Sequence, residues 1–305
     1  MSSPGIGPWI PFNFLALPEE KSALDTSPIV LIPIPYDSTT SHRTGARDGP
    51  RAIIHASYNL EDYDHQLGLD VSAIGIHTTP FLEPHMAGPL EMVDRVARTV
   101  GSFASRGKVV GLLGGEHTIA IGAVKAMHEV YPDLSVLYLD AHGDLRDQYM
   151  DTKVGHATVA RRLTEVCPTV QVGIRSLSLE EVGFIAKGTV KTFLWNESSP
   201  EVPQRDTLLS HLTPWVYISI DLDVLDPSIM SAVGTPEPGG MTWSQVVTLV
   251  EDVARHRRIV GFDVSELSPG EGPHACSYTA AKLVYKLIAC SRWMAPEGTD
   301  ALRKA

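Results

Sequence analysis

Short apolar segments recur along the whole chain, and most of them are rich in β-branched residues. Within each segment, apolar residues follow one another without the polar alternation of a strand that has one face in water. Such segments suit strands that are covered on both faces, as in a parallel sheet flanked by helices. The predicted strands are Ile29–Ile34, Val71–Ile76, Val109–Leu113, Ser135–Leu139, Val170–Ile174, Val190–Leu194, Val216–Ile220 and Ile259–Val264.

Between most of these strands the apolar residues follow a helical spacing, which predicts amphipathic helices. No polar or low-complexity linker interrupts the alternation of strands and helices. The pattern therefore predicts an α/β fold of one domain, a three-layer sandwich with an eight-stranded parallel sheet and helices on both faces. The helical spacing is clearest at Leu90, Val93, Val96, Ala97 and Val100, and at Val246, Val247, Leu249, Val250 and Val253.

Residues 1–27 differ from the rest because they hold several prolines and aromatic residues but show no clear period. We expect them to form an N-terminal arm ahead of a catalytic domain at 28–305. The favoured interpretation is an irregular arm packed on the surface. The alternative is an arm that makes contacts in an oligomer or rims a pocket.

Composition narrows the classes of partner. The formal net charge of −11 argues against nucleic acid or an anionic membrane surface as the main partner. Cys167, Cys276 and Cys290 are few and widely spaced, so they indicate neither a disulfide framework nor a thiolate zinc site. The sequence shows no export signal and no membrane-spanning run, which together with the cysteines predicts a cytoplasmic protein.

Three of the predicted strands run directly into acidic residues and histidines. The motifs are Gly-Gly-Glu-His117, Asp140-Ala-His142-Gly-Asp144 and Asp221-Leu-Asp223. Because extended backbone repeats every two residues, Asp140, His142 and Asp144 are expected on one side of the chain, and Asp221 and Asp223 likewise. Ligands of parallel α/β sheets bind beyond the carboxyl ends of the strands, so these side chains are predicted to meet.

Several carboxylates that emerge from an apolar sheet repel one another unless cations compensate them. Oxygen and imidazole ligands without thiolates favour Mn²⁺, Mg²⁺, Fe²⁺ or Zn²⁺, and the excess of carboxylates favours Mn²⁺. The ligand number suits two ions, which can ionise and position a water. An EF-hand is excluded because Asp226 and Ala232 stand where that loop needs Gly and Glu. A dinucleotide-binding GxGxxG motif is absent.

Taken in order, these motifs resemble the ureohydrolase family of arginases and agmatinases. The resemblance adds Asp226-Pro227 and Asp263-Val-Ser-Glu266 and extends from about Ile29 to the helix that ends near Cys290. Three further segments resemble the bacterial and archaeal agmatinases in particular: Pro35-Tyr-Asp-Ser-Thr, Asp144-Leu-Arg-Asp147 and Gly155-His-Ala157. The resemblance implies an arginase-like fold.

It also implies roles for individual residues. One Mn²⁺ would be held by His117, Asp140, Asp144 and Asp221, and the other by Asp140, His142, Asp221 and Asp223. His156 would be the proton-shuttling histidine, Glu266 the acid that binds the guanidinium, and Thr235 a supporting hydroxyl. Glu116 stands where the family more often has Asp, and we expect its longer side chain to change how His117 is oriented.

The implied reaction is hydrolysis of agmatine to putrescine and urea by a hydroxide that bridges two Mn²⁺ ions. Asp144 would orient the nucleophile and accept its proton, and His156 would protonate the departing amine, which calls for an acid that titrates near physiological pH. Glu266 would bind the guanidinium in bidentate fashion. The net negative site would attract this small cationic guanidine substrate.

The substrate's tail is less constrained by the sequence. Tyr149, Met150 and Asp151 suit an apolar tether that ends in a second cation, as in agmatine. Arg146 and Lys153 suit a carboxylate instead, as guanidinobutyrate or arginine would carry. The favoured interpretation is that Arg146 pairs with Asp147 or another surface acid.

Two rival functions remain open at this stage. A two-metal phosphoesterase is suggested by Asp140-x-His142, but its Gly-Asn-His-Glu element is missing. A non-catalytic metal-binding oligomer descended from the enzyme would be expected to lose ligands, His156 or Glu266, and none is lost. The family resemblance also implies a homo-oligomer, a trimer or hexamer.

Overall fold

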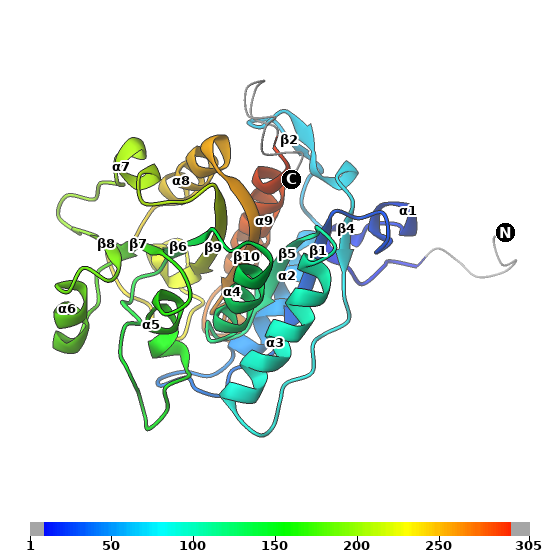
Figure 1. The fold of residues 1–305 in the computed structure, drawn as a ribbon. Helices are drawn as coiled ribbons and strands as arrows, with labels where there is room; N and C mark the ends of the chain where they lie inside the picture. The colour runs from blue at the N-terminus through cyan, green and yellow to red at the C-terminus, as the bar shows by residue number, and fades with distance from the viewer. Residues whose placement is uncertain (1–8, 294–305) are drawn as a thin grey trace, which may run out of the picture.

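The computed structural model describes residues 9–293. At its centre is an eight-stranded sheet in which all neighbouring strands are parallel, in the order β4-β1-β5-β10-β9-β6-β7-β8 (Figure 1). A separate two-stranded antiparallel pair, β2 and β3, lies outside this sheet. The strands are β1 Ile29–Ile34, β2 Tyr63–Asp64, β3 Leu69–Asp70, β4 Ile76–Thr78, β5 Val109–Gly114, β6 Leu134–Leu139, β7 Thr169–Ile174, β8 Lys191–Leu194, β9 Trp215–Asp221 and β10 Arg258–Ser265.

Helices cover both faces of the sheet, and each face has its own apolar core. Buried residues of α3, α4, α5 and α6 pack on one face, and those of α2, α7, α8 and α9 pack on the other (Figure 1). The helices are α1 Glu19–Ser22, α2 Gly49–Ser57, α3 Pro89–Ala104, α4 Ile119–Val130, α5 Val159–Thr164, α6 Leu179–Ile185, α7 Arg205–Leu209, α8 Trp243–His256 and α9 His274–Arg292, with short 3₁₀ turns between them. The predicted three-layer α/β fold is confirmed.

Seven of the predicted strands match the sheet closely, but the strand predicted at Val71–Ile76 is wrong in position. Val71–Ala73 form a 3₁₀ turn, because the side chain of Asp70 caps it by accepting a hydrogen bond from the Ala73 amide. Gly75 then adopts φ 88°, a left-handed conformation that an extended run of residues does not allow. The edge strand β4 therefore begins only at Ile76 and ends at Thr78.

The described part of the predicted N-terminal arm packs against the domain and includes two short regular elements. It contains a 3₁₀ turn at Phe14–Ala16 and the short helix α1. The Phe14 side chain is fully buried, and its backbone amide donates to Oγ1 of Thr78 at 3.0 Å. The backbone amide of Leu15 donates to Oγ of Ser57 at 2.8 Å. Residues 1–8 of the predicted arm lie outside the described residues.

Across residues 9–293 we find no helix with the length and apolar character needed to span a bilayer.

Candidate metal centre and active site

The register of the four central strands, β5, β10, β9 and β6, aligns their carboxyl ends at one edge of the sheet. Leu139 of β6 is paired with Ile220 of β9, and Val264 of β10 is paired with both Ile220 and Leu113 of β5. Parallel strands end at the same edge of a sheet, so the next residue of each strand emerges beside the others. These next residues are Gly114, Asp140, Asp221 and Ser265.

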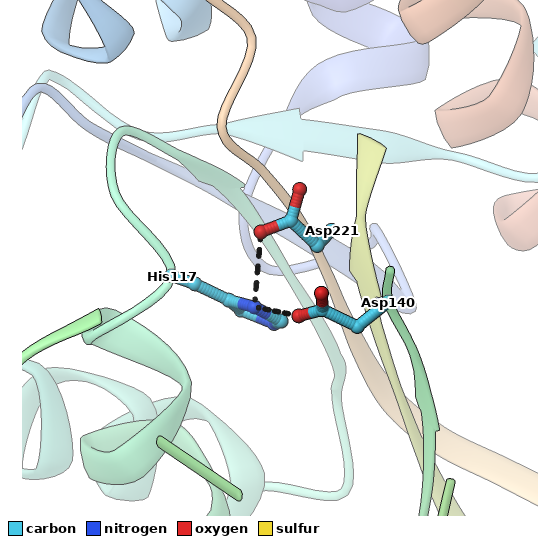
Figure 2. A group of neighbouring side chains, drawn as sticks. All are labelled: His117, Asp140 and Asp221. Atoms are coloured by element: carbon cyan, nitrogen blue, oxygen red, sulfur yellow. Dashed lines mark hydrogen bonds and ion pairs between the residues drawn. The ribbon is translucent and has the colours of Figure 1, made fainter. Parts of the chain in front are cut away.

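His117, Asp140 and Asp221 form the first group of possible metal ligands. Nδ1 of His117 lies 3.2 Å from Oδ2 of Asp140 and 3.4 Å from Oδ2 of Asp221 (Figure 2). Figure 2 shows both carboxylates approaching the same edge of the imidazole. The three residues are buried, and their ligand atoms lie within 4.8 Å of one another. A single cation placed among them would be in reach of all three.

The other ring nitrogen of His117, Nε2, contacts polar side chains on the side away from the aspartates. Nε2 lies 2.8 Å from Oγ of Ser219 and 3.5 Å from Oδ1 of Asp263. The imidazole also stacks on Tyr138, with ring centroids 4.8 Å apart and planes 10° apart. Such contacts fix the tautomer and orientation of a histidine ligand and leave Nδ1 facing the aspartates.

Tyr138, Ser219 and Asp263 were not predicted to have roles of their own in the site. Tyr138 and Ser219 each precede a predicted ligand, Asp140 or Asp221, by two residues and so lie on the same face of the strand. That spacing was a usable signal. Asp263 was recognised only as part of a motif.

The second group consists of Asp140, His142 and Asp223. Nδ1 of His142 lies 2.9 Å from Oδ2 of Asp223 and 3.7 Å from Oδ1 of Asp140. Two of these carboxylates fix the turn that follows β6, because Asp140 accepts the amide of His142 at 2.6 Å and Asp223, which follows β9, accepts the amide of Ala141 at 3.0 Å. Asp140 belongs to both groups, which is the arrangement expected of a bridging ligand.

Asp144 lies outside both groups of three and has a different environment. Its backbone adopts φ 50°, an uncommon left-handed conformation for a residue other than glycine. Oδ2 of Asp144 accepts a 2.6 Å hydrogen bond from the hydroxyl of Tyr138, and the same hydroxyl lies 3.1 Å from Nδ1 of His117. The carboxylate therefore sits next to the first group, and its place among the ligands stays a prediction.

The electrostatics of these carboxylates fit a cation site. Burial, reinforced by the charges of Asp223 and Asp140, raises the pKa of Asp221 well above its usual range. Burial and the charge of Asp140 do the same to the pKa of Asp144. Four buried aspartates face only two histidines, so the anionic forms need additional positive charge. The donor set of oxygen and imidazole, without thiolate, suits Mn²⁺, Mg²⁺, Fe²⁺ or Zn²⁺.

Glu266 follows β10 and turns toward the same centre. Its backbone has φ 69°, and its amide donates to the carbonyl of Gly115 at 2.8 Å. Oε1 of Glu266 accepts the amide of His117 at 2.7 Å, so one carboxylate oxygen is anchored to the loop that carries a candidate ligand. Burial and the charge of Glu116 raise the pKa of Glu266 to about 8. A cation bound against it would favour the ionised form.

Six of the nine predicted site residues line one cavity of about 260 Å³, whereas His117, Asp140 and Asp223 do not line it. Thr235, predicted to be a supporting hydroxyl, lies on its wall and donates to Oδ2 of Asp223 at 3.4 Å. Polar and charged groups line most of the cavity, among them His142, Asp144, His156, Asp221 and Glu266. All three residue types needed for the predicted chemistry, namely metal ligands, a guanidinium-binding acid and a histidine, therefore face one space.

His156 begins a 3₁₀ turn at His156–Thr158 and lines the cavity. Burial lowers the pKa of His156 to about 4. The expectation of an acid that titrates near physiological pH is therefore not met, because the ring is neutral at pH 7. His156 must take up a proton before it can deliver one.

Glu116 does not act on His117 as expected. Its carboxylate, fully buried, accepts the amide of Thr39 at 2.7 Å and the hydroxyl of Thr39 at 2.8 Å. The ring of His117 is oriented instead by Ser219 and Tyr138. The longer side chain of Glu116 therefore reaches a different loop.

Arg146 also differs from its favoured interpretation. Asp147 pairs with Arg162 at 2.8 Å and with Lys153 at 3.6 Å rather than with Arg146. The guanidinium of Arg146 lies over the ring of Tyr149, 5.1 Å from its centroid, and both residues line the cavity. Among residues 9–293, Arg146 forms no ion pair.

Met150 and Asp151, which were predicted to contact the substrate's tether, lie away from the cavity. Met150 and Asp151 form a tight turn, closed by Tyr149 and Thr152, in which both central residues have positive φ. Met150 is 69 % exposed, and neither Met150 nor Asp151 lines the cavity. Of the three residues proposed to contact a tether, only Tyr149 is placed to do so.

Comparison with known proteins agrees with this geometry. Residues 27–290 match the model of the Arginase family. The chain is 40% identical to the N(1)-aminopropylagmatine ureohydrolase of Thermus thermophilus, over 90% of this chain and 94% of that protein. It is 36% identical to the protein of the same name from Synechocystis sp., over 91% and 93% of the two chains. The crystal structure of the agmatine ureohydrolase of Thermoplasma volcanium matches with a TM-score of 0.79 and 33% identity, over 89% and 94% of the chains.

The geometry and the family match agree. Aspartates and histidines gather at the carboxyl edge of the sheet with the acid Glu266 beside them, and the family match covers nearly the whole chain. The chain belongs to the Arginase family and is an amidinohydrolase.

Proposed function

We propose that the chain is a binuclear manganese ureohydrolase that cleaves agmatine to putrescine and urea. The observation that carries the proposal is that Asp140 belongs to two groups of possible ligands, and that one other member of each group, Asp221 or His142, lines the same cavity as Glu266. One ion would be held by His117, Asp140, Asp144 and Asp221, and the other by Asp140, His142, Asp221 and Asp223. When bound, the two ions would ionise and position a water next to the substrate.

Glu266 would hold the reacting end of the substrate. One of its oxygens is engaged by the His117 amide, so the carboxylate has a fixed direction while it presents its remaining lone pairs to the cavity. A planar guanidinium matches a carboxylate through two parallel hydrogen bonds. This grip would place the guanidinium carbon beside the metal ligands, and proximity of this kind supplies a large part of a hydrolytic rate enhancement.

The chain also supplies groups that can move a proton. With cations bound beside it, Asp144 would be ionised. Its carboxylate, which accepts a hydrogen bond from Tyr138, could then take a proton from the attacking water and release it again toward the departing amine. Collapse of the tetrahedral intermediate requires a proton on the departing amine nitrogen. His156, neutral at pH 7, would relay a proton rather than store one.

Two observations support an agmatine-like substrate. The site carries several carboxylates and attracts a cation. In addition, the similar proteins from Thermus thermophilus and Synechocystis are named for N(1)-aminopropylagmatine, and the one from Thermoplasma volcanium for agmatine. The ring of Tyr149 on the cavity wall provides apolar surface for the carbon chain that these compounds share.

A second candidate is a guanidino acid such as guanidinobutyrate. The observation in its favour is Arg146, a cation on the cavity wall without an ion-pair partner in residues 9–293. A terminal carboxylate would give Arg146 a partner, whereas a terminal ammonium would be repelled by it. The two candidates therefore differ in the sign of the charge at the far end of the substrate.

The decisive experiment measures urea release from agmatine, N1-aminopropylagmatine, guanidinobutyrate, arginine and formimidoylglutamate with Mn²⁺ supplied. We expect kcat/KM to be highest for agmatine or its N1-substituted form. A preference for guanidinobutyrate would select the second candidate. Absence of urea from every compound would favour a non-catalytic metal-binding protein, and hydrolysis of p-nitrophenyl phosphate would favour a phosphoesterase.

Two further measurements test the parts of the mechanism. Glu266→Gln is expected to lower kcat/KM at least tenfold, while Glu165→Gln, at the exposed residue that follows α5, should leave it unchanged. Metal analysis of the active protein should give two ions per chain, and a value clearly below two would contradict the paired-ion site.

We also propose that the protein is cytoplasmic and that it forms a trimer or hexamer. Light scattering after size exclusion can test the oligomeric state.

A further inference from the structure

Residues 35–41 form a loop that lies against the His117 segment and reaches His156; we refer to it as the 35–41 loop. The amides of Gly115 and Glu116 donate to the carbonyls of Ile34 and Tyr36 at 2.9 and 2.7 Å. The approach is so close that a side chain at Gly115 would place its first carbon 2.0 Å from the Tyr36 carbonyl oxygen. The loop is therefore fastened to the backbone just before a candidate metal ligand.

We propose that Glu116 and Thr39 are positioning residues that fix the ring of His156 at the edge of the active cavity. This inference rests on the proposed function, in which His156 relays a proton. It assigns a role to a buried glutamate that the metal site does not use and to a loop far from it in the sequence.

Glu116 is the anchor. Its side chain is fully buried, and it makes no ion pair within residues 9–293. Each carboxylate oxygen receives a different group of one residue, because Oε2 accepts the amide of Thr39 and Oε1 accepts its hydroxyl. Two bonds to one residue fix both its backbone and its χ1 angle. The Thr118 hydroxyl and the Ser38 amide also reach this carboxylate, but Thr39 binds it through both backbone and side chain.

Thr39 connects this anchor to His156. Its hydroxyl donates its single proton to Glu116, so toward His156 it can only accept. It accepts the backbone amide of His156 at 3.0 Å, and Nδ1 of the ring lies 3.4 Å from the same oxygen. An acceptor next to Nδ1 favours the tautomer that carries its proton there.

Ser41 completes the arrangement from the other side of the ring. Its Oγ lies 3.0 Å from Nε2 of His156. With the proton on Nδ1, Nε2 has a free lone pair that accepts from the Ser41 hydroxyl. Nε2 is thereby left as the basic atom of a neutral imidazole, next to an exposed hydroxyl of the same cavity wall. A histidine that relays protons needs this fixed orientation more than it needs additional charge.

The test compares Thr39→Val, which keeps the shape but removes the hydroxyl, with Thr39→Ser, which keeps the hydroxyl. In the manganese-loaded enzyme we expect Thr39→Val to lower kcat at least tenfold while KM changes less than threefold. Thr39→Ser should stay within threefold of the wild type. Glu116→Gln, which replaces one acceptor oxygen by a donor, should lower kcat in the same manner. Metal content should stay at the wild-type value in all three.

A double-mutant cycle separates positioning from a general structural role. In a His156→Asn background, Thr39→Val should lower kcat less than twofold, because the ring that Thr39 positions is gone. An equal loss in both backgrounds would overturn the proposal, as would an unchanged kcat in Thr39→Val alone.

A crystal structure of metal-loaded Thr39→Val gives a readout that does not depend on activity. We expect the His156 ring to be rotated or split between two orientations. A ring in its wild-type position would overturn the proposal. If the wild type released no urea from any guanidine while the ring still moved in Thr39→Val, the proposed function would fall and the positioning would stand.

Discussion

The hydroxyl of Tyr138 donates a 2.6 Å hydrogen bond to Oδ2 of Asp144. Both side chains are buried, and the bond joins the carboxyl end of β6 to a residue held in a left-handed backbone conformation. The same tyrosine stacks on His117. Tyr138 therefore orients a proposed ligand and a proposed proton acceptor at once.

This relationship predicts that Tyr138→Phe lowers activity without loss of the fold. A hydrogen bond to a charged group contributes about 1.5–3 kcal/mol, which corresponds to a loss of roughly ten- to a hundredfold if it acts in the transition state. The stacking on His117 would be kept, so metal content should remain at the wild-type value. Steady-state kinetics with metal analysis provide the check, and a kcat/KM within twofold of the wild type would contradict the role of the hydroxyl.

Ser219 offers a test of the metal site that does not rely on turnover. Its Oγ lies 2.8 Å from Nε2 of His117, on the side away from the aspartates. Loss of such an outer contact typically weakens metal binding about 10- to 100-fold. Ser219→Ala should therefore raise the dissociation constant of at least one Mn²⁺ by that factor in a calorimetric titration.

A matched control exists on the neighbouring strand. Ser135 is also buried, but it lies near the opposite end of β6, where it contacts Thr213. Ser135→Ala should leave metal affinity unchanged. Equal weakening in both variants would show that the effect comes from the sheet and not from the orientation of His117.

The low pKa of His156 predicts the form of the pH profile. With a pKa of about 4, the ring is protonated only below that pH and is neutral throughout pH 6–9. His156→Asn should therefore lower kcat/KM by a similar factor at every pH in this range, measured with saturating Mn²⁺. If His156 instead titrated near 6.5 as an acid, the wild type would lose activity as the pH rose through that value, and this limb would be absent from the variant.

The sequence was sufficient to predict which side chains meet at the carboxyl edge of the sheet, because the main signals are local. Asp140, His142 and Asp144 lie within five residues, and β6 and β9 continue directly into their ligands. The parallel register that aligns these strands follows from apolar runs covered on both faces. Local pattern and tertiary position agree at these residues.

Features that depend on distant contacts could not be predicted in the same way. Thr39 contacts His156 because the 35–41 loop packs on Gly115. The sequence around either residue contains no signal for the other. The position of Phe14 likewise involves a distant residue, because its amide donates to the hydroxyl of Thr78 on the edge strand β4. The pKa of His156 is set by the degree of burial, which a sequence motif does not contain.

Lys286 gives a prediction about stability that is independent of catalysis. This lysine on α9 is only 4% exposed, and its Nζ lies 2.8 Å from Asp64 and 3.6 Å from Glu251 on α8. Replacing it by methionine would leave the buried carboxylate of Asp64 without its cation, whereas Glu251 would keep its ion pair with Arg255. Removal of one partner from a buried ion pair costs about 3–5 kcal/mol. The network shares no residue with the cavity, so Lys286→Met should lower the free energy of unfolding by that amount and leave kcat within twofold.

Lys282, one turn earlier on the same helix, is the control for this change. It is less buried and lies over the ring of Tyr285, with its Nζ 3.6 Å from the ring centroid. A contact of this type contributes only about 0.5–1 kcal/mol at partly exposed sites, so Lys282→Met should change the unfolding free energy by no more than that. Denaturant titration of both variants measures the difference. Equal destabilisation would contradict the assignment to Asp64, because it would indicate a general effect of losing a long cationic side chain from α9.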